Sequence, residues 1–211
     1  MSFTARDAIL LKIRQALTQQ VPIPFSNRGT NEFVFQPSLK EVELEFAENF
    51  SKLQGRFSFC ANNQELAQQL NVLVETRKWS KVICKETTLE TTLANHNFVN
   101  INQQVSLSNC DVAITTCEAL VARTGSIFLS SATASGRNNS VYAPVHICIA
   151  YTSQLVYDIA DGLALIKKKF GDNLPSIISL ATGPSRTADI EKTLVVGVHG
   201  PKEVFCFLVD G

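Results

Sequence analysis

The hydrophobic positions of the chain begin with a stretch at helical spacing. Ala8, Ile9, Leu10, Leu11, Ile13 and Leu17 follow Thr4 with polar residues between them. This pattern predicts an amphipathic helix over residues 4–19. Residues 21–38, rich in Pro, Asn, Ser and Gly, predict an irregular connection longer than the usual loop of about 4–6 residues. The helix is therefore predicted to be an arm, which packs either on its own domain or on a partner subunit.

From Ser38 onward, apolar runs at helical spacing alternate with short apolar runs typical of buried strands. The predicted helices span residues 39–53, 64–78, 88–95 and 158–170, and the predicted strands span 56–60, 81–84, 111–116, 126–130, 146–150, 176–180 and 203–209. This alternation is typical of an α/β fold with a largely parallel sheet and flanking helices. We therefore predict two parts, an N-terminal helix and linker arm over 1–37 and an α/β domain over 38–211.

Ligands of open α/β sheets bind outside the carboxyl ends of the strands. We therefore expect a functional site in the loops that follow Thr116, Ser130, Leu180 and Val198.

The charge balance excludes some classes of partner. Nineteen basic and nineteen acidic residues cancel, and the short run Lys167–Lys169 is explained by the preference of cations for a helix C-terminus. This composition argues against nucleic acid and anionic membranes as partners. No apolar run approaches the roughly 20 residues of a membrane span, and the N-terminus does not resemble a secretory signal. We therefore expect a cytoplasmic protein.

Six cysteines show no paired spacing, and four of them lie in or at the end of strand-like apolar runs. Free cysteine in such places behaves as a small hydrophobic residue, so we expect reduced thiols.

Two glycine-bearing turns near the C-terminus carry polar side chains beside apolar runs. In the first turn, Gly183, Ser185 and Thr187 precede Asp189. A strand, a glycine turn and hydroxyls at the start of a helix would form a cradle for phosphate or carboxylate. The alternative is that Ser185 only caps a short helix, with Asp189 or Glu191 bonding back to the turn.

The second turn, Gly197–Pro201, places His199 next to Gly200, where backbone can approach a ligand closely. A histidine with a pKa of about 6.5 can serve there as acid, base or hydrogen-bond donor. Alternatively, its ring nitrogens fix the tight turn.

A third group of candidates follows the strand that ends at Thr116. Glu118 comes directly after this strand, and Thr124, Gly125 and Ser126 begin the next one, so we expect Glu118 and Thr124 at the same edge of the sheet. Glu118 is a candidate catalytic carboxylate. Arg123 favours an anionic substrate, with an exposed surface arginine as the alternative.

The loop Ser135–Ser140 presents Arg137, which suits recognition of a carboxylate or phosphate. His146 is expected to close this loop through hydrogen bonds. A metal site shared by His146 and His199 lacks ligand spacing on any one element, so no metal site is predicted. The chain has no Walker loop, no Gly-x-Gly-x-x-Gly turn and no serine nucleophile elbow, and it identifies no cofactor.

The two C-terminal turns form the string Thr-Gly-Pro-Ser-x-Thr-Ala-Asp-Ile-Glu, followed by Gly-Val-His-Gly-Pro and a closing Leu-Val-Asp. This string resembles the signature of the LUD domain, in particular the stand-alone lactate utilization protein C type. The segments Ala122–Leu129, Ser135–Arg137 and Pro144–Ile147 agree with it, and the resemblance covers nearly the whole chain.

The resemblance implies a fold similar to that of phosphosugar isomerases, glucosamine-phosphate deaminases and coenzyme A transferases. It also implies a cytoplasmic component of L-lactate utilization, which oxidises lactate to pyruvate together with an iron–sulfur partner and a cysteine-rich partner. The ligand would be a small carboxylate, or a phosphorylated or coenzyme A-like anion, on a surface that includes the turn from Gly183 to Asp189. A sister branch carries cysteine clusters for iron–sulfur centres, which are absent here, so electron transfer by this chain itself is not expected.

Many members carry an acidic residue where this chain has Arg123, which weakens any carboxylate nucleophile or metal ligand at that position. An alternative from the fold group is a stand-alone isomerase, or an acyl-group or sugar-phosphate enzyme, with His199 or Glu118 as acid/base. Coenzyme A transferases form a covalent adduct on a glutamate, but the motif around that glutamate is not present here. A purely structural subunit is the third alternative. The sequence leaves open the ligand and whether the protein is a homo-oligomer.

Overall fold

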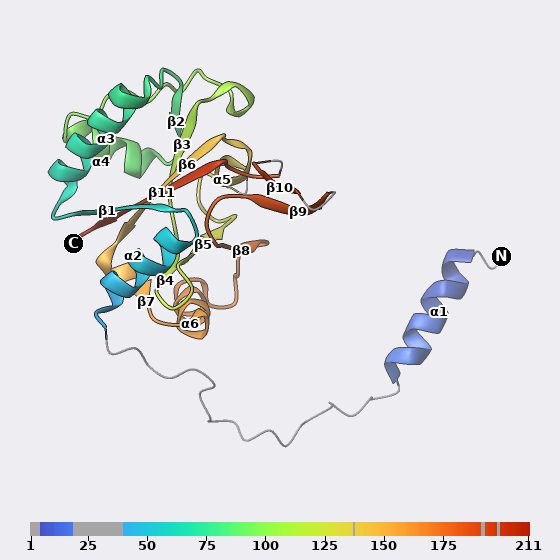
Figure 1. Cartoon of the computed structure of the whole chain (residues 1–211). Helices are drawn as coiled ribbons and strands as arrows, with labels where there is room; N and C mark the ends of the chain where they lie inside the picture. The colour runs from blue at the N-terminus through green and yellow to red at the C-terminus, as the bar shows by residue number, and fades with distance from the viewer. Residues whose placement is uncertain (1–4, 19–39, 137, 191–192, 198) are drawn as a thin grey trace. The chain divides into compact units, whose positions relative to one another are not determined.

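The computed structural model describes residues 5–18, 40–136, 138–190, 193–197 and 199–211 (Figure 1). The chain divides into two units, Met1–Pro37 and Ser38–Gly211. The described element of the first unit is helix α1 (Ala5–Thr18), which confirms the predicted N-terminal helix. No residue of α1 is buried, and Ile9, Leu10, Leu11, Ile13 and Leu17 are exposed. What this apolar face packs against stays a prediction.

The second unit is built on a five-stranded sheet in which every neighbouring pair is parallel. Its strand order is β1 (Arg56–Cys60), β11 (Glu203–Val209), β6 (Val145–Tyr151), β3 (Val112–Thr116) and β2 (Val82–Cys84). This arrangement confirms the predicted α/β class. Helices α3 (Asn63–Arg77) and α4 (Thr87–Asn95) lie together on one side of the sheet (Figure 1). Leu66, Leu70 and Leu93 on these helices pack against Ile114 and Ile147 of the strands.

The opposite face of this sheet packs against helix α2 (Val42–Lys52) and a second sheet. The second sheet has four strands in the order β7 (Leu155–Val156), β4 (Ala119–Val121), β5 (Ser126–Ser130) and β8 (Ile178–Ala181). Phe46 and Phe50 of α2 share one apolar cluster with Leu120 and with Cys148 and Cys206 of the large sheet. The small sheet is therefore held between the large sheet and helix α6 (Ile159–Phe170).

Helix α6 (Ile159–Phe170) covers the outer side of the small sheet, where Ile166 packs on Phe128. The helix begins as predicted, because Asp158 accepts a hydrogen bond from Ala160 N and Asp161 bonds back to the backbone N–H of Asp158. Within the described residues, no helix is both long and apolar enough to cross a membrane.

The sequence did not predict several short elements. These are β4, β7, helix α5 (Asn139–Tyr142), two 3₁₀ turns (Leu107–Asn109 and Thr152–Gln154), and the antiparallel pair β9 (Arg186–Ile190) and β10 (Thr193–Val196). The predicted helix start after Thr182 is wrong, because β9 occupies these positions. Thr187 pairs with Val195, and such β-branched residues favour a strand over a helix.

Candidate functional site

The two C-terminal turns come together around a cavity of about 210 Å³, whose lining includes Gly183, Ser185, His199 and Gly200. His146 and Val204 also line it, and each is the second residue of its parallel strand, β6 and β11. The cavity, called here the amino-edge cavity, therefore lies at the amino ends of these two strands. The predicted loops after Leu180 and Val198 follow β8 and β10, which are not strands of the main sheet, so these turns lie at the amino edge of the main sheet and not at its carboxyl edge.

Backbone hydrogen bonds join the turns to each other. Ser185 N donates to Pro201 O at 2.9 Å, and Gly197 N donates to Ser185 O at 3.0 Å. Gly183 has a φ of +78°, and a Cβ at this position would lie 2.8 Å from Leu53 O, so only glycine fits without strain. These bonds fix Ser185 and Gly200 next to each other.

His146 is the most buried polar residue of the cavity lining, with 1% of its surface exposed. Its Nε2 lies 2.8 Å from Thr115 Oγ1 on the neighbouring strand, and the Thr115 hydroxyl donates to Thr116 O at 2.9 Å. Burial lowers the pKa of His146 to about 4, so the ring is neutral near pH 7. The expectation that His146 closes the preceding loop is wrong, because its described bond goes to β3.

Ser130 connects the amino-edge cavity to a buried carboxylate. Ser130, the last residue of β5, lines the cavity and donates to Glu118 Oε1 at 2.5 Å. Glu118 is 2% exposed, and its Oε2 accepts from Lys169 Nζ at 2.7 Å. Glu118 follows β3 at the carboxyl edge of the sheet, as expected. Lys169 is therefore an ion-pair partner of Glu118 and not only a cation at a helix end.

A second hollow, called here the carboxyl-edge cleft, has a volume of about 400 Å³ and is lined by Glu86, Thr88, Glu118 and Lys169 among others. Glu86 is 8% exposed and accepts hydrogen bonds from Thr116 N and from Ser135 Oγ, the latter at 2.7 Å. Glu86 was not predicted as a site residue from the sequence. Its signal was a carboxylate just after the apolar strand β2.

The segment Thr124–Ser126 belongs to neither hollow. It forms the turn between β4 and β5, where Gly125 has a φ of +59° and a Cβ would lie 2.5 Å from Phe50 N. Ser126 Oγ is 2.8 Å from Thr182 Oγ1. The register pairs Ala119 with Phe128 and Val121 with Ser126, so Glu118 and Thr124 lie at opposite ends of β4. The expectation of a shared edge is wrong because this pair of strands is an antiparallel hairpin.

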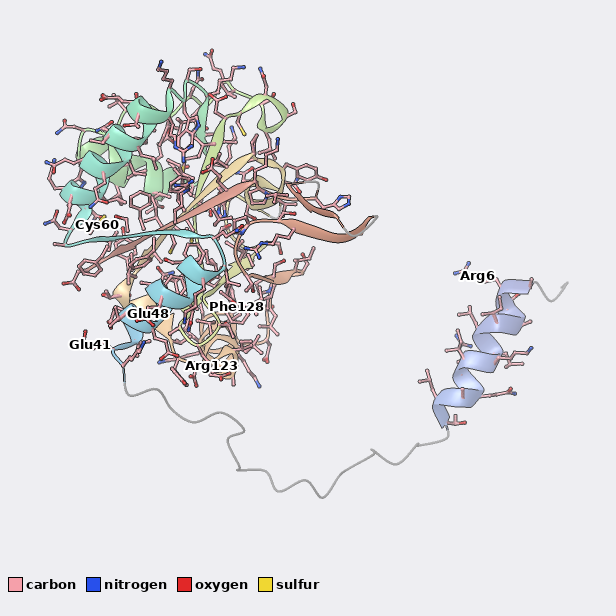
Figure 2. All side chains as sticks on the ribbon, in the orientation of Figure 1. Arg6, Glu41, Glu48, Cys60, Arg123 and Phe128 are labelled. Carbon is pink, nitrogen blue, oxygen red and sulfur yellow. The ribbon has the colours of Figure 1, made fainter. Side chains whose placement is uncertain are left out.

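Arg123 lies beside α6 (Figure 2) and its Nε is 2.5 Å from Asp158 Oδ2. Hydrogen bonding from Arg123 lowers the pKa of Asp158. The Arg123 side chain is 20% exposed and Asp158 caps α6. Arg123 therefore fixes the β4–β5 turn to the start of helix α6. This structural role differs from both predicted roles, an arginine that binds an anionic substrate and an exposed surface arginine.

Three predicted site residues, Arg137, Thr187 and Asp189, lie wholly or partly outside the described part of the structure. Arg137 lies outside the described residues, although its neighbour Gly136 lines the amino-edge cavity. The backbones of Thr187 and Asp189 belong to β9, while their side chains are outside the described part of the structure.

All six cysteines are buried and free: Cys60, Cys84, Cys110, Cys117, Cys148 and Cys206. Burial raises the pKa of the Cys84 thiol to about 12, which suppresses its reactivity. Among the described residues, no group of three or more His, Cys, Asp or Glu side chains could hold a metal ion.

The family model of the LUD domain matches residues 44–209 of the chain. Lactate utilization protein C of Bacillus licheniformis is 38% identical over 102 residues, which are 47% of this chain and 42% of that protein. The Shouchella clausii protein of the same name is 39% identical over 101 residues, covering 47% and 44%. The Bacillus subtilis protein of this name is 38% identical over 102 residues, covering 47% and 42%. The matched region thus spans less than half the length of these relatives.

A crystal structure of a DUF162 family protein from Deinococcus radiodurans has a similar fold. The TM-score is 0.58 at 17% sequence identity, and the match covers 80% of this chain and 96% of the other. At this identity the likeness establishes the fold and not the activity.

Proposed function

Because the chain belongs to the LUD domain family, we propose that it takes part in lactate utilization and binds a small anionic metabolite in the amino-edge cavity. The observation that supports this proposal is that the two C-terminal turns, which carry the family string, line the same cavity. Their lining residues are Gly183, Ser185, His199 and Gly200. The names of the relatives supply the process.

The size of the cavity favours a small acid over larger anions. Its volume of about 210 Å³ lies below the roughly 300–1,000 Å³ of pockets that hold drug-sized ligands. L-Lactate fits this size class better than a coenzyme A thioester or a nucleotide. His199 at the rim offers a hydrogen bond to the carboxylate, and Arg137, next to Gly136 in the chain, is the candidate counter-charge.

The oxidation of lactate to pyruvate requires electron acceptors, which we assign to partner proteins. We propose an iron–sulfur protein and a cysteine-rich protein of lactate utilization as these partners, in the cytoplasm. The buried thiols of this chain, with no exposed cysteine cluster among the described residues, fit a protein that binds the metabolite while its partners carry electrons.

Growth on L-lactate as the sole carbon source tests this function. Cells lacking the gene should fail to grow on L-lactate and should recover with the wild-type gene, but not with a Ser185→Trp gene that fills the cavity. A Ser176→Trp gene is the matched control, because Ser176 is exposed and bonds only Ser131 among the described residues. Normal growth of the deletion strain on L-lactate would contradict the proposal.

A stand-alone enzyme is the second candidate, and the carboxyl-edge cleft favours it. The buried carboxylate of Glu118 lies in a hollow at the edge where α/β sheets bind ligands. His199 lines the other cavity, so Glu118 would be the acid/base here. Glu118→Gln should then abolish turnover in a coupled assay without unfolding the protein, and unchanged turnover would exclude this candidate.

A further inference from the structure

Two polar groups of the amino-edge cavity have their own protons already engaged. Thr116 O can only accept and lies 2.9 Å from Thr115 Oγ1, so we assign the Thr115 hydroxyl proton to this contact and the proton between Thr115 and His146 to His146 Nε2. A neutral histidine that carries its proton on Nε2 has a lone pair on Nδ1. No described residue bonds this Nδ1.

The Ser130 hydroxyl also uses its own proton in a hydrogen bond and keeps an acceptor position. Its hydroxyl proton is committed to Glu118 Oε1 at 2.5 Å, and its oxygen accepts from Ala132 N at 3.2 Å. A hydroxyl oxygen accepts two hydrogen bonds, so one acceptor position of Ser130 is left. Releasing the Ser130 proton would cost the charge-assisted bond to a carboxylate that is 2% exposed.

His146 and Ser130 therefore both line one cavity, and each has an acceptor position that no described residue occupies. Resting on the proposed function, we propose that these two residues recognise a hydroxyl group, so that the cavity binds small 2-hydroxy acids in preference to 2-keto acids. The ligand hydroxyl donates to one of these acceptors. A keto oxygen has no proton to donate, and it would face lone pairs instead.

An ammonium group is also a donor, but it fits this cavity less well. Leu129, Ile177 and Val204 make part of the wall apolar, and the nearby carboxylate of Glu118 is already paired with Lys169. An ammonium would lose its hydration there without gaining an unpaired negative charge among the described residues. An uncharged hydroxyl loses much less hydration free energy than an ammonium group, so amino acids should bind more weakly than hydroxy acids.

The rest of the lining suits the other parts of a 2-hydroxy acid. The side-chain hydroxyls of Ser140, Ser179 and Ser185 make no hydrogen bond within the described part of the chain. They can rotate to donate to a carboxylate. The apolar wall accepts a methyl group or another short side chain.

Calorimetric titration of the full chain with L-lactate, pyruvate and L-alanine tests this specificity. Wild-type protein should bind L-lactate about tenfold more tightly than pyruvate, the ratio expected for one hydrogen bond. Thr115→Val removes the partner of His146 Nε2 and releases the ring to its other tautomer, and Ser130→Ala removes the second acceptor. The variant that removes the acceptor bound by the ligand hydroxyl should bring the lactate-to-pyruvate affinity ratio close to one, so at least one of the two variants should do so.

Ser131→Ala is the control, because Ser131 Oγ contacts Ser176 Oγ at 3.0 Å and accepts from the backbone N–H of Ile177 at 3.2 Å, while Ser131 itself is not part of the cavity lining. This variant should keep the wild-type ratio. Circular dichroism confirms that each variant is folded, and the ratio of two affinities does not depend on the active fraction.

Equal or tighter binding of pyruvate by wild-type protein would overturn the inference, as would a ratio that neither Thr115→Val nor Ser130→Ala changes. Failure to bind either acid would also overturn it, while growth of the deletion strain tests the role in lactate utilization separately. Preference for L-lactate combined with normal growth of that strain would leave this inference intact and reject the proposed function.

Discussion

Acidification from pH 7 to pH 5 should destabilise the protein through His146. The pKa of His146 is lowered to about 4 in the folded state by burial, against about 6.5 in an unfolded chain. Between these two values the unfolded chain takes up a proton that the folded protein refuses. The stability is therefore fully present above pH 6.5 and decreases as the pH falls toward 4.

The linkage relation gives the size of this effect. With these two pKa values, the free energy of unfolding falls by about 2 kcal/mol between pH 7 and pH 5 from His146 alone. Such a loss is a large fraction of the usual stability of about 5–15 kcal/mol, so it is measurable. Most exposed carboxylates stay ionised above pH 5 and contribute little in this window.

Urea denaturation at pH 7, 6 and 5 measures the slope. His146→Gln should lower the stability at pH 7 but flatten the dependence on pH, because glutamine does not titrate. His96→Gln is the control: His96 is half-buried with Nδ1 2.8 Å from Thr92 O, and the wild-type slope should persist in this variant. A wild-type stability that is constant from pH 7 to pH 5, or a His146→Gln protein with the wild-type slope, would refute the assignment of a buried neutral histidine.

Three further predictions concern the turns and the ion pairs. Gly125→Ala should lower the free energy of unfolding by more than about 3 kcal/mol, since the new Cβ would lie 2.5 Å from backbone. Gly136→Ala, at a φ of +56° with nothing within 4 Å of the new Cβ, should lower it by only about 1–2 kcal/mol. Melting curves that do not separate these two variants would contradict this prediction. Lys169→Met leaves the buried Glu118 without its cation and should lower the free energy of unfolding in urea by about 3 kcal/mol. Glu118→Gln leaves a half-exposed lysine and should lower it by about 1 kcal/mol. The reverse order of the two losses would contradict the ion pair. Arg123→Gln should lower stability by about 1 kcal/mol and leave the affinity for L-lactate unchanged, and a loss of affinity in calorimetry would show that this arginine binds the ligand.

Local signals in the sequence were enough for the longer elements. Helix α6 was predicted over residues 158–170 from apolar residues at helical spacing, and in the structure it follows the cap residue Asp158 and ends at Phe170. The three-residue strand β4 was missed because Ala119, Leu120 and Val121 are too few to show a period. Only their hairpin pairing with β5 makes them a strand.

The position of the site depended on pairing between distant residues, which local patterns do not report. Loops after strands were expected at the carboxyl edge, but Gly197–Pro201 leads into β11, and Lys202 N donates to Pro144 O just before β6. This contact brings the turn to the amino ends of both strands. The role of His146 was predicted wrongly for the same reason, since its hydrogen-bond partner Thr115 lies 31 residues away on another strand.

Ser185, His199 and Gly200 were each predicted as site residues from the two turns, but their meeting in one cavity was not predicted. Glu118 was also located correctly after β3, but its pairing with Lys169 required the tertiary structure. A buried carboxylate needs a partner, yet the sequence offers many lysines and does not identify the right one.

A crystal structure of the protein grown with L-lactate tests the central claim most directly. The account predicts electron density for L-lactate in the amino-edge cavity, with its hydroxyl within hydrogen-bond distance of His146 Nδ1 or Ser130 Oγ. Density for L-lactate in the carboxyl-edge cleft beside Glu118, with the amino-edge cavity holding only water, would contradict it.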